Sequence, residues 1–307
     1  MLAALDRFFF SGSTPERLGA TRLLLGLGLV PFFGLQFGAF FDVDPFGPSF
    51  YYLDPIWYFG ALGITRLDPA LMQLGTLLLC ATLVGFALGW RTRWCAALSL
   101  ALIVVLKGAR DSVAGDVHHR ELIPFHLLLF FACSRSGEAF SLDALRAGAR
   151  ATLAQWESSW PIMASQLYIA AFYLWSGIAK LRSTGFDWFG TEIARELMLE
   201  RAVRFGIDEN GPIAGSGLGY WLAAHPLALL LPALGVAAIE LGFPLVFLLR
   251  KLWPRVVFLA GVTLFHIANF VLLNVMFLFM PVVFVMFFDP SRLAARIAPR
   301  LAAAPNR

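Results

Sequence analysis

The chain has 307 residues, of which 59% are hydrophobic and only 14% are charged, and its mean hydropathy is +0.73. A soluble domain carries about 25% charged residues, so this chain lacks the polar surface that a water-soluble fold needs on all sides. The composition excludes an ordinary soluble domain and predicts an all-α, polytopic transmembrane helical bundle in a lipid bilayer, because helices satisfy their own backbone groups in lipid.

The net charge of +4 indicates membrane topology and contact with lipid headgroups. No basic block with interleaved aromatic residues occurs, so no nucleic-acid partner is expected. The three cysteines, Cys80, Cys95 and Cys133, lie in or beside apolar runs without metal-ligand spacing, and no metal is predicted. Repeated His-x-x-His boxes, a Gly-x-Ser-x-Gly elbow, a zincin motif and a phosphate-binding Gly-Lys-Ser/Thr loop are also missing from the sequence.

The first 17 residues are too polar for a secretory signal and predict a separate interfacial segment. The apolar runs that follow cover residues 18–41, 69–89, 94–107, 122–134, 161–180, 226–249 and 255–288. The last run is too long for one span, so we divide it near Leu273-Asn274 and expect about eight membrane helices. Residues 18–289 then form a single transmembrane bundle, and residues 290–307 form a basic cytoplasmic tail.

The charges of the loops predict the orientation of these helices. The loops at 90–93, 134–160 and 250–255 and both ends of the chain are basic, which places them on the cytoplasmic side by the positive-inside rule. The loop at 42–68 carries four aspartates against one arginine and belongs on the outer side. Both termini are therefore expected in the cytoplasm, and segments 42–68, 107–121 and 181–225 emerge outside.

A polar stripe marks the fifth predicted helix. Gln166, Tyr173 and Lys180 are spaced seven residues apart and so fall within about 20° of one line on a helix. Such a stripe on an apolar helix must face other protein or a wet cavity. The alternative is that Lys180 extends its side chain to the membrane interface, as lysines at helix ends commonly do.

Other polar residues stand out in the apolar sequence. His118 and His119 belong to a dense polar cluster in the second outer loop, either as a functional pair or as a solvated loop. His266 and Asn269 share one helix face, where a functional role and interhelical hydrogen bonding both explain them. Glu240 lies within an apolar run and needs protonation or a partner, for which His266 and Arg255 are candidates. His126 is expected to be a satisfied packing residue.

The segment Gln166–Gly190, with Tyr173, Ser176-Gly177, Lys180-Leu181 and Asp187-Trp188-Phe189-Gly190, resembles the membrane domain of vitamin K-dependent gamma-carboxylase. It is also similar to the bacterial relatives grouped as the horizontally transferred transmembrane domain family. Shorter likenesses are His118-His119, Ser141-Leu142-Asp143, and Phe265-His266 with Asn269. The resemblance extends from about residue 107 to residue 290 and implies a multi-pass protein of a bacterial inner membrane.

The resemblance implies specific roles. The lysine matching Lys180 would be the base that starts oxidation of vitamin K hydroquinone, or another quinol, by oxygen. His119, or His118 in an alignment shifted by one residue, would hydrogen-bond an oxyanion or a quinol oxygen. Gln166, Tyr173, Trp188, Glu240, His266 and Asn269 would line the quinol pocket. Desolvation near lipid favours the neutral amine that such a base requires.

Two departures from the carboxylase restrict this expectation. The carboxylase has two consecutive lysines where this chain has Ala179-Lys180, and no counterpart of its large C-terminal soluble region follows the last predicted helix. Carboxylation of propeptide-bearing proteins therefore does not follow from the resemblance, and a peptide or protein substrate or a soluble partner stays open. Three functions remain: a quinol-dependent oxidoreductase or modifying enzyme, a non-enzymatic accessory protein for producing or exporting a secreted peptide, and a transporter.

Overall fold

The computed structural model describes residues 12–38, 54–65, 67–114, 121–148, 153–206, 217–273, 275, 277 and 279–302. All regular secondary structure among these residues is helical, which confirms the all-α prediction. The chain divides into two compact units. Unit 1 comprises the residues up to Gln166 and those from Val282 onward, and unit 2 comprises Leu167–Pro281.

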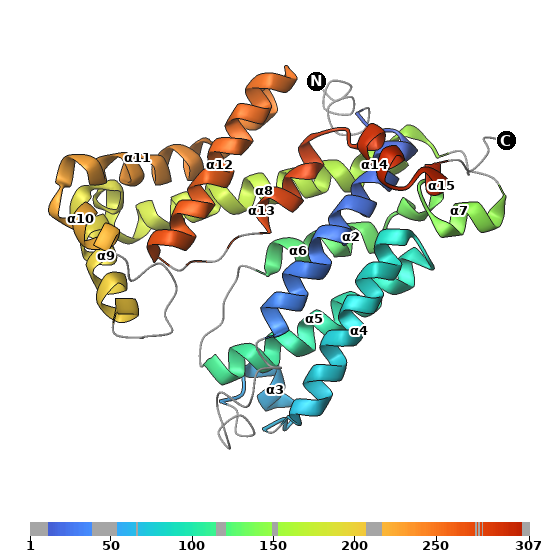
Figure 1. Ribbon diagram of the computed structural model, residues 1–307, viewed down its shortest axis with the longest axis horizontal. Helices are drawn as coiled ribbons and strands as arrows, with labels where there is room; N and C mark the ends of the chain where they lie inside the picture. The colour runs from blue at the N-terminus through green and yellow to red at the C-terminus, as the bar shows by residue number, and fades with distance from the viewer. Residues whose placement is uncertain are drawn as a thin grey trace. The chain divides into compact units, whose positions relative to one another are not determined.

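The helices of unit 1 surround an apolar core. In order, they are α2 (Pro15–Gly38), α3 (Trp57–Ala61), α4 (Pro69–Leu88), α5 (Thr92–Ala114), α6 (Leu122–Ala132), the 3₁₀ turn η2 (Ser136–Glu138), α7 (Leu142–Ala147), the start of α8 (Gln155–Thr184), the end of α13 (Met280–Val283), η6 (Phe284–Phe287), α14 (Ser291–Ile297) and α15 (Pro299–Ala302). Helices α2, α4 and α5 lie side by side (Figure 1). Phe33 is fully buried, and Phe86 packs edge-on against Phe131, so aromatic side chains fill this core.

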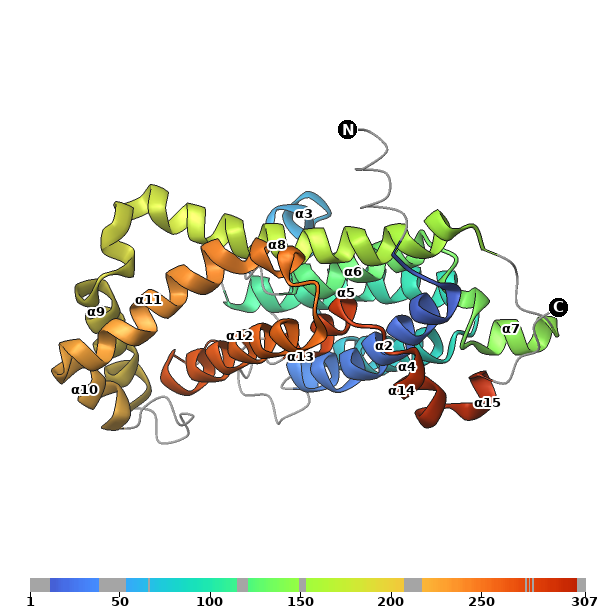
Figure 2. The ribbon, with the colours of Figure 1, turned by 90° about the horizontal axis from the view of Figure 1, so that it is seen from above.

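Within the described residues, unit 2 contains the second half of α8, four further complete α-helices and two 3₁₀ helices. They are η3 (Gly185–Phe189), α9 (Thr191–Gly206), α10 (Gly217–Ala224), α11 (Pro226–Gly242), η5 (Phe243–Leu248) and α12 (Leu252–Leu273). Helix α9 packs against α10, α11 and α12 (Figure 2). Met198, Ala223 and Leu229 form a buried apolar cluster where α9, α10 and α11 meet.

In the part of the chain that the structure describes, five helices are long and apolar enough to cross a bilayer, namely Ala70–Leu88, Thr92–Ser112, Gln155–Phe189, Pro226–Leu248 and Leu252–Leu273. The short predicted run 94–107 is thus extended by its flanking residues, whereas run 122–134 forms a helix of only 11 residues. Helix α12 ends at Leu273, as the division of the last run requires. Among the described residues after it, however, 280–287 form only a short helical turn and a 3₁₀ turn. The count of eight membrane helices stays a prediction.

The N-terminal boundary differs from the predicted one. Residues 15–17 were assigned to a separate interfacial segment, but they form the first turn of α2, with Glu16 in that turn. Acidic residues are favourable there because they face the free N–H groups of the helix. Residues 1–11 lie outside the described part of the chain.

One buried cation connects α2 to the rest of unit 1. The guanidinium of Arg22 is fully buried and donates hydrogen bonds to the carbonyl oxygens of Ser136, Ala139, Ala87 and Phe140. Phe140 has a positive φ of 47°, which is costly for a residue with a side chain. Arg22 therefore stabilises a strained loop and the end of α4 at the same time.

The ends of the helices in unit 1 separate the loops as a two-sided membrane protein requires. Arg17 donates to the carbonyl oxygens of Phe288 and Met286 at the end of the last predicted run, and the backbone N–H of Ser13 donates to Oγ of Ser159. The N-terminal segment and the loop 134–160, both predicted to be cytoplasmic, therefore lie together. At the other end of α5, the backbone N–H of Asp54 bonds to Ser112. At the start of α5, Asp143 of the loop 134–160 accepts a hydrogen bond from the backbone N–H of Thr92. Loops with opposite predicted sidedness therefore contact opposite ends of α5.

We predict that cysteine labelling in sealed vesicles distinguishes these two ends. In a background without the three native cysteines, Arg146→Cys and Arg300→Cys should react only with reagent on the cytoplasmic side. Leu62→Cys, which is well exposed in the short turn after α3, should react only from the other side. Labelling of Arg146→Cys and Leu62→Cys from one side would contradict the topology.

We further predict that Gly26→Ala destabilises unit 1. A Cβ atom at Gly26 would lie 2.7 Å from the Cβ of Ala87 and 2.8 Å from its Cα, so α2 and α4 would have to separate. Overpacking of this kind costs about 1–3 kcal/mol of unfolding free energy. The matched control is Gly261→Ala on α12, whose added Cβ meets nothing within 4 Å. Equal unfolding temperatures for the two variants in detergent would contradict this close approach.

Candidate functional site

The polar face of α8 continues into unit 2 through Tyr173, Ser176 and Lys180. Their spacing of three and four residues places them on one face of the helix. Gln166, which the sequence assigned to the same stripe, belongs to unit 1 and donates its Nε2 to the carbonyl oxygen of Met286 at 2.6 Å. Its amide is thus engaged with the backbone, and the structure does not add it to the group around Lys180.

Lys180 forms an ion pair with Glu240 of α11. The Nζ atom lies 2.7 Å from Oε1 and 2.8 Å from Oε2 of Glu240. Ser176 accepts a hydrogen bond from Nζ at 2.9 Å and donates one to Oε1 at 3.1 Å. The exposed fraction is 22% for the Lys180 side chain and 10% for that of Glu240. The sequence suggested His266 or Arg255 as partners of Glu240, whereas the structure brings it to Lys180 and Ser176.

Gly177 makes this contact between helices possible. A Cβ atom at this position would lie 2.6 Å from Cδ2 of Leu241 and 3.2 Å from Cβ of Glu240. Helix α11 therefore approaches α8 closely at the turn that carries Ser176 and Lys180. The two neighbouring residues therefore have different roles. The hydroxyl of Ser176 hydrogen-bonds to both members of the ion pair, and the absence of a side chain at Gly177 lets α11 approach α8.

Trp188 adds an aromatic surface beside the lysine. Helix α8 ends at Thr184, and Gly185 follows with a φ of +65°, a conformation that favours glycine. This turn starts η3 and places the Trp188 ring centroid 5.8 Å from the Nζ of Lys180. A cation at this distance is attracted to the face of the indole ring.

A second polar contact lies one turn earlier along α8. Tyr173 and Nε2 of His266 on α12 share a short hydrogen bond, and the Tyr173 ring stacks on Phe243 with centroids 4.2 Å apart. Both Tyr173 and His266 are buried. The Nδ1 atom of His266 has no hydrogen-bond partner in the described part of the chain. The structure thus joins the predicted residues Tyr173 and His266 directly.

An apolar cavity of about 260 Å³ lies among α9, α11 and α12. Trp188 forms part of its wall, as do Ile239, the residue before Glu240, and Asn269. Most of the remaining wall is aliphatic. Trp188 therefore connects the cavity to the Lys180–Glu240 pair, and Asn269 places a polar group in a wall that is otherwise mostly apolar.

His118 and His119 of the second predicted outer loop lie outside the described residues. The convergence of this loop with Lys180 stays a prediction. His126, expected to be a packing residue, has its Nδ1 atom 2.7 Å from the carbonyl oxygen of Leu122 in its own helix, to which Nδ1–H donates a hydrogen bond.

Sequence reasoning missed a buried charged cluster in unit 1. Lys107 bonds to Asp111 one turn later, and Arg110 lies 2.9 Å from Oε1 of Glu121, which is almost completely buried. Lys107 is also 3.7 Å from Oε2 of Glu121. The sequence did carry a signal for this cluster, namely the i, i+4 spacing of Lys107 and Asp111 in a largely apolar helix. Charged side chains in such a helix need a partner of opposite charge.

Models of known protein families, curated proteins and solved structures were compared with this chain, and none matches. The resemblance to the carboxylase membrane domain is therefore neither supported nor contradicted.

We predict that Lys180 and Glu240 depend on each other for stability. Lys180→Met or Glu240→Gln should each lower the unfolding free energy in detergent by about 2 kcal/mol, because each leaves the other group without its partner. Fully buried pairs lose about 3–5 kcal/mol, and the partial exposure of Lys180 reduces the effect. The double variant should lose less than the sum of the two. Ser183→Ala, on the exposed side of α8, is the control. Additive effects would argue against the pair.

Proposed function

We propose that this chain is a carboxylase-like protein of a bacterial inner membrane that binds a lipid-soluble quinol in unit 2 and removes a proton from it. The observation that carries the proposal is the position of Trp188, which lines the apolar cavity and lies beside Lys180. The cavity would hold the apolar part of the quinol. Its hydroxyl would face the Lys180–Glu240 pair.

The ion pair determines where the proton goes. When Lys180 is an ammonium, only the carboxylate of Glu240 can accept the quinol proton. When the pair has shifted to a neutral amine and a carboxylic acid, Lys180 is the acceptor. In both cases the quinol O–H bond breaks, its electron pair stays on oxygen, and the resulting quinolate is the form that reacts more readily with an oxidant. Ser176 hydrogen-bonds to both Lys180 and Glu240 and fixes their relative position.

We assign the hydrogen-bonded pair Tyr173–His266 to the same proposed site. Its two rings lie in the apolar interior between α8 and α12, where water is excluded and polar interactions are strong. We propose that His266 and Asn269 orient the quinol, since Asn269 lines the cavity directly. Tyr173 holds the His266 ring in place through the shared hydrogen bond.

A second function is favoured by one specific observation. Lys180, Glu240 and Ser176 satisfy one another without any ligand. A self-contained group of this kind is sufficient as a purely structural contact that fixes α8 against α11. This is expected for a non-enzymatic accessory protein for producing or exporting a secreted peptide. The two functions differ in whether the cavity must be open for the protein to act.

The cavity can be filled without disturbing the fold. A Cβ atom added at Gly235 meets nothing within 4 Å, and Gly235 lines the cavity. We therefore predict that Gly235→Leu keeps the unfolding temperature of the parent protein but weakens binding of a short-chain quinol at least about tenfold, measured by tryptophan quenching in nanodiscs. Gly12, which also has open space around it, provides the control variant Gly12→Leu outside unit 2. Unchanged quinol affinity in Gly235→Leu would exclude this cavity as the site.

We also predict that Lys180→Arg preserves membrane insertion and the ion pair but lowers quinol oxidation at least about 100-fold, because an arginine effectively cannot donate and recover a proton as a base. Lys180→Ala should be equally inactive, and a small external amine should restore part of its turnover. Activity would be measured in membranes at matched protein levels.

The companion variant Glu240→Gln decides between the assignments. Full activity in Lys180→Arg together with loss in Glu240→Gln would make Glu240 the proton acceptor. Full activity in both variants would leave the pair a structural contact between α8 and α11 and would favour the accessory function.

A further inference from the structure

A second pocket, of about 370 Å³, lies in unit 1 beside the turn that connects α4 and α5. Its walls come from this turn, from the residues after α6, and from α7. Unlike the cavity of unit 2, it is lined mainly by polar and charged side chains. Those that matter for its chemistry are Arg91, Arg93, Trp94, Arg135, Glu138 and Asp143.

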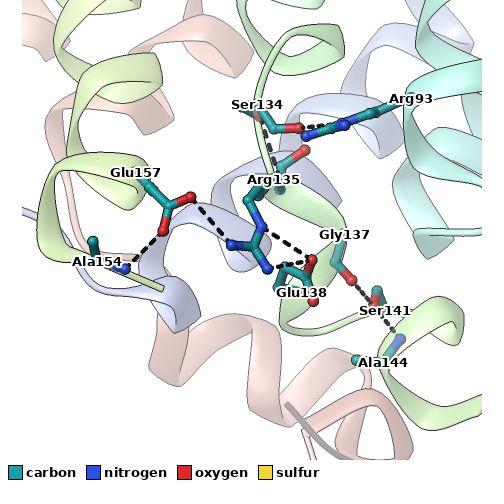
Figure 3. Close-up of polar contacts among 10 residues, drawn as sticks. Arg93, Ser134, Arg135, Gly137, Glu138, Ser141, Ala144, Ala154 and Glu157 are labelled. Atoms are coloured by element: carbon teal, nitrogen blue, oxygen red, sulfur yellow. Dashed lines mark hydrogen bonds and ion pairs between the residues drawn. The ribbon is translucent and has the colours of Figure 1, made fainter. Parts of the chain in front are cut away.

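The acidic residues of this pocket have defined partners. Asp143 accepts hydrogen bonds from the backbone N–H groups of Arg91 and Thr92. Its two carboxylate oxygens therefore cap the N-terminus of α5. Arg135 pairs with Glu138 at 3.2 Å and with Glu157 at 3.1 Å (Figure 3). These contacts fix the pocket walls and neutralise Arg135.

Two arginines remain without a carboxylate. Arg91 and Arg93 are both exposed, and neither forms an ion pair within the described residues. Arg93 uses only its Nε, which donates to the carbonyl oxygen of Ser134 at 3.0 Å (Figure 3). The two terminal nitrogens of Arg93 form no hydrogen bond within the described residues. The guanidinium of Arg91 lies over the Trp90 ring, 6.0 Å from its centroid, and its N–H groups form no hydrogen bond within the same residues. Guanidinium groups match the geometry of phosphate oxygens and bind them with two parallel hydrogen bonds.

The neighbouring tryptophans place the pocket at the depth of lipid headgroups. Trp90 is 43% exposed and Trp94 is 77% exposed, and both lie at the junction of two helices long enough to cross a bilayer. Exposed tryptophans in this position form the aromatic belt of a membrane protein. The outer surfaces of α4 and α5 carry exposed leucines such as Leu77 and Leu98, against which acyl chains would lie.

We propose that this pocket binds the phosphate of an anionic phospholipid, with Arg91 and Arg93 as its ligands and the acyl chains along α4 and α5. The anionic class follows from Arg91 and Arg93, which form no ion pair within the described residues and outnumber Asp143, the one acidic side chain of the pocket that is not paired with Arg135. A zwitterionic lipid would bring an additional positive group close to them. The site is independent of the quinol cavity, because every residue in it belongs to unit 1.

The test uses the full chain in nanodiscs that contain phosphatidylcholine and a minority of phosphatidylglycerol. Native mass spectrometry after release counts the bound phosphatidylglycerol. The double variant Arg91→Gln/Arg93→Gln should weaken this binding at least about tenfold, since each phosphate contact to a charged group contributes more than a neutral hydrogen bond. The matched control is Arg250→Gln/Lys251→Gln, which removes the same charge from an exposed loop of unit 2.

Three outcomes would overturn the proposal. Equal losses in both double variants would mean unspecific attraction between charges, and equal binding of phosphatidylcholine would remove the anionic preference. Displacement of the lipid by millimolar inorganic phosphate would make a soluble anion the ligand. Should the glutamine variant fail to fold, Arg91→Lys/Arg93→Lys decides instead. It keeps the charge but loses the paired hydrogen bonds, so a several-fold weaker affinity supports the site and an unchanged affinity refutes it.

Discussion

The buried guanidinium of Arg22 is the contact on which the packing of unit 1 depends. Carbonyl oxygens at the end of a helix have no partners within that helix, and burying them unpaired costs about 1–3 kcal/mol each. Arg22 reaches the end of α4 through Ala87 and the loop from Ser136 to Phe140 through three further carbonyl oxygens. A single side chain therefore satisfies four buried acceptors that belong to two segments far apart in sequence.

The same contact explains why the polar pocket of unit 1 has a defined shape. The loop that Arg22 holds leads directly into Ser141 and Asp143, whose side chains cap α7 and the start of α5. Gly89, at the end of α4, has a φ of +70° and is close to both Ser141 and the guanidinium carbon of Arg22. Buried charge, helix caps and a left-handed turn thus form one continuous network beneath Arg91 and Arg93.

In unit 2 the Lys180–Glu240 pair connects helices as Arg22 does in unit 1. It differs from Arg22 in that two opposite charges, and not one, are removed from water. Two opposite charges that leave water recover their desolvation cost only with good geometry and additional hydrogen bonds. Ser176 supplies such bonds, and Gly177 lets the two helices approach closely enough for them. A pair that is costly to build and lies beside a cavity is a reasonable place for proton chemistry, and it is equally a firm connection between α8 and α11.

Sequence alone determined the properties that depend on local repetition. Apolar runs predicted α4, α5, α8, α11 and α12, which are long and apolar enough to cross a membrane, and α12 ends at Leu273, where the long last run was divided. The spacing of Tyr173 and Lys180 placed them on one face, because helix periodicity is a property of neighbouring residues. Only the tertiary structure decided which groups meet across helices. Glu240 lies 60 positions from Lys180, and Arg22 more than 110 from Ser136, and no local pattern records such a partner. The sequence indicated that Glu240 needed protonation or a partner, and the packing of α8 against α11 brought it to Lys180.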